Sequence, residues 1–209
     1  QSLKNGNKKT VIKKLFLTAA VAVSSVTFAQ QFGAKAGMNV STISDEGFDD
    51  TKSKVGYYAG VFMNVPVSES FSIQPEVLYN NLGSKVSSTV LGTTYSSTLN
   101  LDYVAVPVMF QYKATPQFYL EAGPEFGFLV NAKQKFDNGS SSIVTELDKE
   151  DFNSFNMGVG LGLGFDISKN VGLNARYVAG FSDITKESGP ATDAKNKNNA
   201  FQVGLNIKF

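Results

Sequence analysis

The sequence contains no cysteine and no histidine. The absence of cysteine excludes disulfide bonds, and the absence of both residues excludes zinc sites built from them. Mechanisms that need a thiolate nucleophile or a histidine base are excluded as well, so histidine-dependent lipases and proteases are disfavoured. With these residue types missing, the sequence predicts a protein that is not an enzyme and that has neither a cofactor nor a catalytic or structural metal site.

A basic surface is also missing. The formal net charge is +1, but five lysines precede residue 30, so the remainder of the chain carries −4. These five are Lys4, Lys8, Lys9, Lys13 and Lys14. Because no basic stripe survives beyond them, nucleic acid is not expected as a partner.

The beginning of the chain has the pattern of a targeting segment. Lys13 and Lys14 precede an apolar run of about a dozen residues, which is shorter than the roughly 20 that a membrane-spanning helix needs. Small residues follow this run, as a signal peptidase requires, and we expect cleavage between Ala29 and Gln30. The predicted organisation is an upstream extension without structure (1–11), a signal peptide (12–29) and one domain (30–209).

From Gln30 onward, apolar and polar residues alternate in repeated segments. In "FNMGVGLGLGFDI" (155–167), large apolar residues occupy one set of alternate positions, and glycine, Asn156 or Asp166 fills the other. This period of two predicts a strand with two different faces. A dinucleotide-binding loop instead needs GxGxxG at the start of a helix, so nucleotide binding is not favoured.

Eight such segments can be counted, at about 32–43, 55–66, 71–83, 99–112, 118–132, 154–167, 171–182 and 200–209. The connectors alternate between about three to five residues and about 11 to 20 residues, so all the short ones lie at one end of an antiparallel array. An even number of strands also places both termini at that end. We therefore predict an all-β fold, an eight-stranded antiparallel up-and-down transmembrane β-barrel with short periplasmic turns and long external loops.

Alternation alone does not say which face points outward, since a soluble lipocalin-like barrel turns its apolar face inward. The polar face decides the matter because it is rich in glycine, which would leave a water-facing surface nearly without side chains. Turned inward, the same glycines suit a narrow lumen, and the apolar face becomes a lipid-facing band. Aromatic residues gather near both strand ends and predict two girdles: Phe71, Tyr112, Phe118, Phe165 and Phe209 near the short turns, and Tyr57, Tyr79, Phe155, Phe181 and Phe201 near the loops.

Three prolines fall inside predicted strands. Pro75, Pro107 and Pro124 each remove a ladder hydrogen bond, and a closed barrel has no edge strand on which proline is tolerated. We expect β-bulges at these positions.

The segments "IQPEVLYNNLG", "LDYVAVPVMFQYK", "FYLEAGPEFGFLVNAK" and "VGLNIKF" together resemble the small outer-membrane β-barrel family, often labelled porin-like, that is common in Bacteroidetes. The resemblance covers nearly all of the chain after residue 30 and accounts for the in-strand prolines. It implies a location in the bacterial outer membrane, and it implies that Phe209 is the C-terminal aromatic residue that the barrel assembly machinery recognises. The expected partners are outer-membrane lipid, that machinery and an unknown extracellular loop partner, and the chain is expected to be a monomer.

The inward face carries a charge cluster that is predicted to plug or gate the lumen: Lys35, Glu76, Glu121, Glu125, Asp166, Arg176 and Lys208. Charges sealed in a barrel must pair or be reached by water, and Arg176 could face Glu76, Glu121 or Glu125. Glu121 and Glu125 lie about 13 Å apart along a strand, too far for a glycosidase pair.

The long loops are the remaining place for function. Two of them hold acidic clusters, Asp45, Glu46, Asp49 and Asp50 in one and Glu146, Asp148, Glu150 and Asp151 in the other, read as a solvated surface or as weak divalent-cation sites. The Ser/Thr-rich segment 84–100 predicts a hairpin that continues beyond the membrane and could pair with a partner strand. The sequence thus predicts a structural or surface-interaction protein with a largely plugged lumen, with a narrow passive porin for small polar solutes and a soluble lipocalin-like ligand-binding barrel as alternatives.

Overall fold

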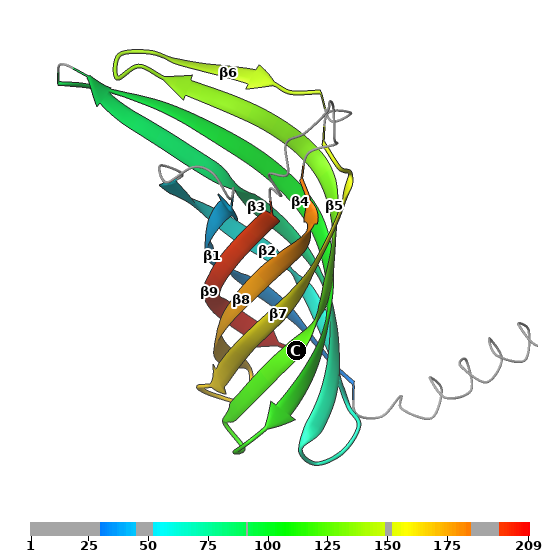
Figure 1. Cartoon of the computed structure of the whole chain (residues 1–209). Coiled ribbons are helices and arrows are strands. Elements are labelled where there is room, and N and C mark those ends of the chain that lie inside the picture. The colour runs from blue at the N-terminus through cyan, green and yellow to red at the C-terminus, as the bar shows by residue number, and fades with distance from the viewer. Residues whose placement is uncertain (1–29, 45–51, 91, 149–151, 185–196) are drawn as a thin grey trace, which may run out of the picture.

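The computed structural model describes residues 30–44, 52–90, 92–148, 152–184 and 197–209 (Figure 1). The predicted signal peptide, its cleavage site after Ala29 and the upstream extension lie outside these residues. These residues form nine strands: β1 (Gln31–Ser44), β2 (Lys52–Pro66), β3 (Phe71–Val90), β4 (Thr93–Lys113), β5 (Phe118–Asp137), β6 (Ser142–Glu146), β7 (Phe155–Asp166), β8 (Val171–Asp183) and β9 (Lys197–Lys208). No helix among the described residues is long and apolar enough to cross a membrane.

Eight of the strands close into a ring. The order around the sheet is β4-β3-β2-β1-β9-β8-β7-β5, and an additional β4–β5 pairing joins the two ends. Every neighbouring pair in the ring is antiparallel. The predicted eight-stranded antiparallel barrel is therefore confirmed.

The three short turns share one local design. Ser68, Thr115 and Ser168 each accept a hydrogen bond, through the side-chain hydroxyl oxygen, from the backbone N–H three residues later. Those donors belong to the first residue of the next strand, so each hydroxyl holds the chain in its reversal. At the same end, the backbone N–H of Phe209 donates to the Phe32 carbonyl at 2.8 Å, which ties the C-terminus to β1.

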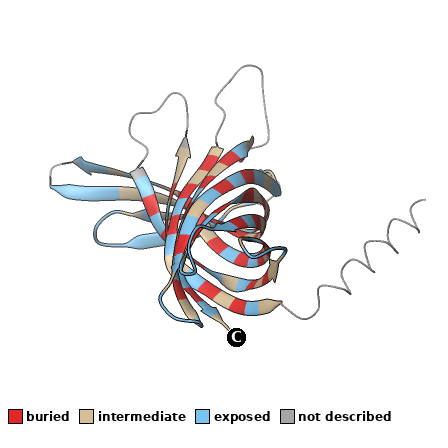
Figure 2. Cartoon of the chain, turned by 90° about the horizontal axis from the view of Figure 1, so that it is seen from below, coloured by how far each residue is buried: buried red, intermediate tan, exposed pale blue. Residues whose placement is uncertain are grey.

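Burial alternates along the strands (Figure 2), as expected when every second side chain of a barrel strand points into the lumen. In β9, Gln202 and Asn206 are buried, whereas Phe201, Val203 and Leu205 are each about half exposed. A soluble barrel cannot turn such a continuous apolar face to water. The lipocalin-like alternative is therefore wrong, and the apolar face is the one that suits lipid.

Aromatic side chains are exposed at both ends of this apolar surface, as predicted. Near the short turns, the rings of Phe71 and Tyr112 lie 5.0 Å apart between centroids, and near the loops the rings of Tyr57 and Tyr79 lie 6.2 Å apart. These positions match the interfacial girdles of membrane barrels.

The inward glycines allow close approach inside the barrel. Gly37 and Gly204 are direct cross-strand partners, and a Cβ atom on Gly37 would lie 2.8 Å from the ring of Tyr58. On the opposite side of the ring, a Cβ atom on Gly164 would overlap the ring of Tyr119. The glycine positions therefore make room for aromatic rings that lie against neighbouring strands in the lumen.

The prediction of bulges at the three prolines is wrong. Each proline interrupts only one of its two ladders. The missing pairs are those opposite Pro75 in β2–β3, Pro107 in β3–β4 and Pro124 in β4–β5. The flanking pairs have the same register on both sides of each gap. A backbone N–H in an antiparallel strand points to only one neighbour, so proline loses its hydrogen bond on one side. The intact ladder on the other side, such as Pro124↔Val159, maintains the register. The register shifts that do occur lie toward the long-loop end, in β2–β3, β4–β5 and β8–β9.

The predicted hairpin beyond the barrel is present, and the neighbouring strand β5 extends alongside it. The β3–β4 ladder continues to Val90↔Thr93, and β5 follows β4 outward as far as Asp137. A further strand that was not predicted, β6, pairs with this outer part of β5. We define the outer ribbon as residues 84–90, 92–100 and 133–146, and it extends past the remaining strands (Figure 1).

Candidate functional site in the barrel lumen

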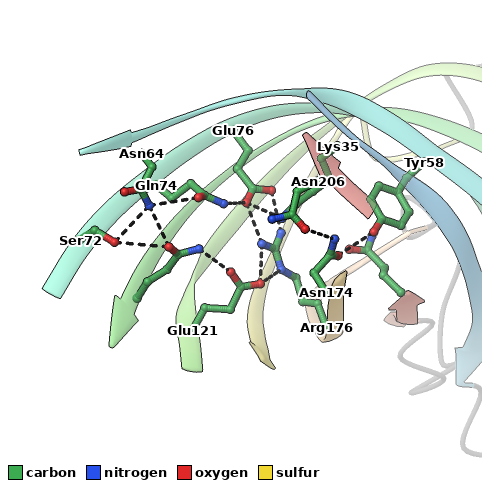
Figure 3. A network of polar contacts seen from close by, with 12 residues as sticks. Lys35, Tyr58, Asn64, Ser72, Gln74, Glu76, Glu121, Asn174, Arg176 and Asn206 are labelled. Atoms are coloured by element: carbon green, nitrogen blue, oxygen red, sulfur yellow. Dashed lines mark hydrogen bonds and ion pairs between the residues drawn. The ribbon is translucent and has the colours of Figure 1, made fainter. Parts of the chain in front are cut away.

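Arg176 on β8 spans the lumen. Its guanidinium donates to both oxygens of Glu76 on β3, from Nη1 at 2.9 Å and from Nη2 at 2.8 Å, and Nε donates to Glu121 on β5 at 2.8 Å (Figure 3). In the eight-membered ring, β3 and β8 are opposite strands, so the bidentate pair crosses the full width of the barrel. All three side chains are buried.

Glu76 accepts hydrogen bonds from two further side chains. Lys35 on β1 donates from Nζ at 2.9 Å, and Gln74 donates from Nε2 at 2.8 Å, both to Oε1 of Glu76. Buried ions are tolerated when they are paired and their remaining hydrogen-bonding capacity is filled. Two cations, Lys35 and Arg176, here match two carboxylates, Glu76 and Glu121.

Neutral polar side chains extend the network toward the short-turn end. Gln111 donates to Glu121 at 3.0 Å, and Asn64 donates to Gln111 at 2.8 Å and to Gln74 at 3.2 Å. Ser72 donates to Gln111 at 3.3 Å. Four strands, β2 to β5, thus meet inside this part of the barrel (Figure 3).

A second set of contacts crosses the lumen beside the first. The hydroxyl of Tyr58 on β2 donates to Asn174 on β8 at 2.8 Å, and Asn174 donates to Asn206 on β9 at 3.3 Å. Together with the Arg176 contacts, these bonds connect opposite walls with side chains. The arrangement is chemically that of a polar core, in which side chains fill the interior of a small barrel.

An apolar cluster lies in the barrel on the loop side of this network. Its buried members are Leu82, Leu101, Tyr103, Leu129, Ala132, Phe152, Ile184 and Ala200. Phe152 and Ile184 come from outside the strands and pack on inward residues of β3, β4, β5 and β9. The lumen is therefore filled by polar contacts at one level and by an apolar core at the next.

The charged residues singled out from the sequence separate into three groups. Lys35, Glu76, Glu121 and Arg176 form one network. Asp166 lies apart from them and pairs with Lys208 near the short turns. Glu125, although fully inside the barrel, makes no ion pair with any described residue.

Sequence reasoning missed the neutral members of the network, namely Tyr58, Asn64, Ser72, Gln74, Gln111, Asn174 and Asn206. The period of two that identified the inward charges also identifies these residues, since all of them occupy inward positions of their strands. Charge alone does not mark them, because amide and hydroxyl groups make up much of the lumen filling.

The loop residues are only partly described. Asp45, Glu46, Asp49, Asp50, Glu150 and Asp151 lie outside the described residues. Glu146 pairs with Lys133 across β5 and β6 at 3.2 Å. Among the residues that the structure describes, no group of three or more Asp, Glu, His or Cys side chains is placed to hold a metal ion.

Comparison with known proteins identifies the family to which the chain is similar. The model of the outer membrane protein beta-barrel domain family matches residues 28–186, more than half of the chain. Among solved structures, Ail, the attachment invasion locus protein of Yersinia pestis, is similar with a TM-score of 0.51 and 14% identity, over 87% of this chain and 100% of Ail. Neisserial surface protein A gives a TM-score of 0.49 and 12% identity, over 87% of this chain and 99% of that protein. No curated protein matches the chain significantly.

Proposed function

The chain belongs to the outer membrane protein beta-barrel domain family, and from that premise we propose that it is a non-enzymatic structural or surface-interaction protein whose lumen is closed to solutes. Membership of the family implies a location in the bacterial outer membrane. A signal peptide at residues 12–29, as the sequence predicts, would supply the export that this location requires.

One observation carries the proposal. The bidentate Glu76–Arg176 pair joins opposite strands of an eight-stranded barrel, and the network around it fills the interior. A solute crossing this level has to break buried, charge-assisted hydrogen bonds, which are among the strongest in proteins. The apolar cluster on the loop side adds a second barrier, because apolar constrictions exclude water and ions.

Liposome swelling tests the proposal against the narrow-porin alternative. Proteoliposomes containing the chain are expected to swell no faster than protein-free liposomes in isotonic arabinose or glycine, whereas a general porin in the same lipid swells rapidly. Swelling above the protein-free rate at matched protein content would replace the closed barrel with the narrow passive porin.

The surface-interaction part of the proposal rests on the outer ribbon. A hollow of about 330 Å³ on the ribbon is lined by four apolar side chains that are roughly half exposed or more, together with serines, Asp137 and Asn138. The four are Val86, Tyr95, Phe136 and Ile143. Val86, Ser97, Phe136 and Ile143 are successive cross-strand partners, so they form one row across four strands. An exposed, largely apolar row on a ribbon that extends past the other strands is typical of a contact surface.

The ribbon hypothesis predicts that cell attachment depends on this hollow. Cells that carry the Tyr95→Ser and Ile143→Ser double variant are expected to attach several-fold less to matrix-coated surfaces than cells with the unchanged chain, because the variant removes exposed apolar area. The control is Val144→Ser, which makes a similar change at an exposed residue that does not line the hollow. Equal attachment of all three strains at equal surface levels would exclude the hollow as a contact site.

A further inference from the structure

A small cavity lies inside the barrel between the Arg176 network and the apolar cluster. Residues of six strands line it, among them Asn80, Tyr103, Glu125, Gly127, Gly158 and Asn198. It offers about 20 Å³ to the centres of water molecules, which is enough to hold a water. Glu125, Gly158 and Gly180 are successive cross-strand partners, and the two glycines line the cavity without contributing side chains to it.

Several polar atoms at this cavity have no hydrogen-bond partner. They are Nδ2 of Asn80, the hydroxyl oxygen of Tyr103, Oε2 of Glu125, and both Nδ2 and Oδ1 of Asn198. The four residues are at least nine-tenths buried, with exposed fractions of 0%, 2%, 8% and 4% in that order. Buried polar atoms are normally satisfied, and this set contains donors as well as acceptors. Water is the small molecule that can serve both kinds, since it donates and accepts.

The charges of the lumen do not balance if Glu125 is ionised. Lys35 and Arg176 are already matched by Glu76 and Glu121. Glu125 would add a third negative charge, and no Lys or Arg nitrogen of the described residues lies within ion-pair distance of it. Tyr103, the other titratable side chain at the cavity, supplies no positive charge. An isolated buried carboxylate is costly, so the site requires one positive charge.

We propose that Glu125 and this cavity form a hydrated proton-binding site that is separate from the ion-pair network. Oε2 of Glu125 takes a proton from hydronium, which is left as water, and the neutral carboxyl then donates to a water in the cavity. The amide donors of Asn80 and Asn198 favour water over a metal cation as the second occupant, because N–H groups repel a cation. Proton binding here does not depend on whether solutes cross the barrel.

Infrared difference spectroscopy of the reconstituted chain tests the proton directly. At neutral pH, the wild-type minus Glu125→Gln spectrum is expected to contain the carbonyl band of a protonated carboxyl, because glutamine removes that group with little change in shape. The Glu69→Gln variant alters an exposed glutamate in a turn and is expected to give no such band. A wild-type spectrum without the band, or a carboxylate band that shifts when sodium replaces potassium, would overturn the proposal.

Filling the cavity tests the water. A Cβ atom on Gly127 would lie 3.4 Å from the Tyr103 ring and 3.6 Å from Cβ of Asn156, which are ordinary contacts, so Gly127→Ala is expected to fold. By taking up space beside Glu125 it is expected to slow deuteration of the Glu125 carboxyl and to shift its carbonyl band toward that of a group with weaker hydrogen bonding. An unchanged band and an unchanged exchange rate in this variant would show that no water contacts Glu125.

Discussion

Replacing Arg176 with methionine is expected to lower the free energy of unfolding by about 3–5 kcal/mol, the range found when one partner of a buried ion pair is removed. The variant leaves Glu76 and Glu121 buried with only Lys35 to balance them. It also removes the donors that cross the barrel between β8 and β3. Unfolding in urea from lipid vesicles, followed by the mobility of unboiled protein in SDS, measures the change.

A second substitution separates charge from packing. The double variant Arg176→Met with Glu121→Gln keeps the Lys35–Glu76 pair, whose atoms lie 2.9 Å apart, and restores the balance of charge in the network. It is expected to be more stable than Arg176→Met alone, because the uncompensated carboxylate is gone. Exposed Lys85→Ala serves as the surface control. If Arg176→Met cost no more than Lys85→Ala, the network would not be holding the lumen together.

The second large effect is expected at Gly123 on β5. A Cβ atom there would overlap the carbonyl oxygen of Val108 and lie 2.9 Å from its carbonyl carbon. Backbone atoms of β4 cannot move aside as a side chain can, so Gly123→Ala is expected to cost at least the roughly 1–3 kcal/mol of an overpacked core. The same urea titration measures it, together with the yield of folded barrel.

Gly127→Ala is the matched control, since it makes the same chemical change on the same strand and the same face. Its Cβ atom meets nothing closer than 3.4 Å, so the expected loss is at most about 1 kcal/mol, the net contribution of one hydrogen bond made by the cavity water. Equal losses at Gly123 and Gly127 would mean that close approach of strands does not explain the inward glycines. A loss at Gly123 alone would support the narrow lumen.

The strands were predictable because every strand of a membrane barrel alternates between apolar residues that face lipid and polar or small residues that face the lumen. The alternation in β7 and β9 predicted their bounds to within about three residues, and the glycine content of the inward face predicted which side meets lipid. The outer ribbon was harder to predict. β6 has only five residues, "SIVTE", all exposed, and so gives no alternation of burial. It forms because the outer part of β5 offers a free edge.

The bulges at the prolines were predicted wrongly for a different reason. The missing N–H was correctly expected to interrupt a ladder, but a bulge forms only if the register also shifts in the ladder on the other side of the strand. Pro107 keeps its pairing with Glu125, so the strand stays in register. This outcome depends on which neighbour each N–H faces, and that is fixed by ring closure rather than by the local sequence.

The sequence predicted that charged side chains line the lumen, but it did not predict which of them pair with one another. Inward charge on β1, β3, β5 and β8 could be read from the period of two, yet Asp166 pairs with Lys208 and Glu125 stays outside the network. Which charges meet depends on the stagger of strands around the barrel, which one strand's sequence does not state. The same stagger sets Arg176 opposite Glu76 rather than Glu125.

Recording from planar bilayers tests the closed lumen most directly, because ions report a path too narrow for sugars. The purified wild-type chain, shown to be folded by its shift in mobility between unheated and boiled samples in SDS, is expected to give no discrete conductance steps at neutral pH. Stable steps of uniform size in the wild type, lost in a Gly127→Leu variant that obstructs the lumen, would contradict the account and identify a pore.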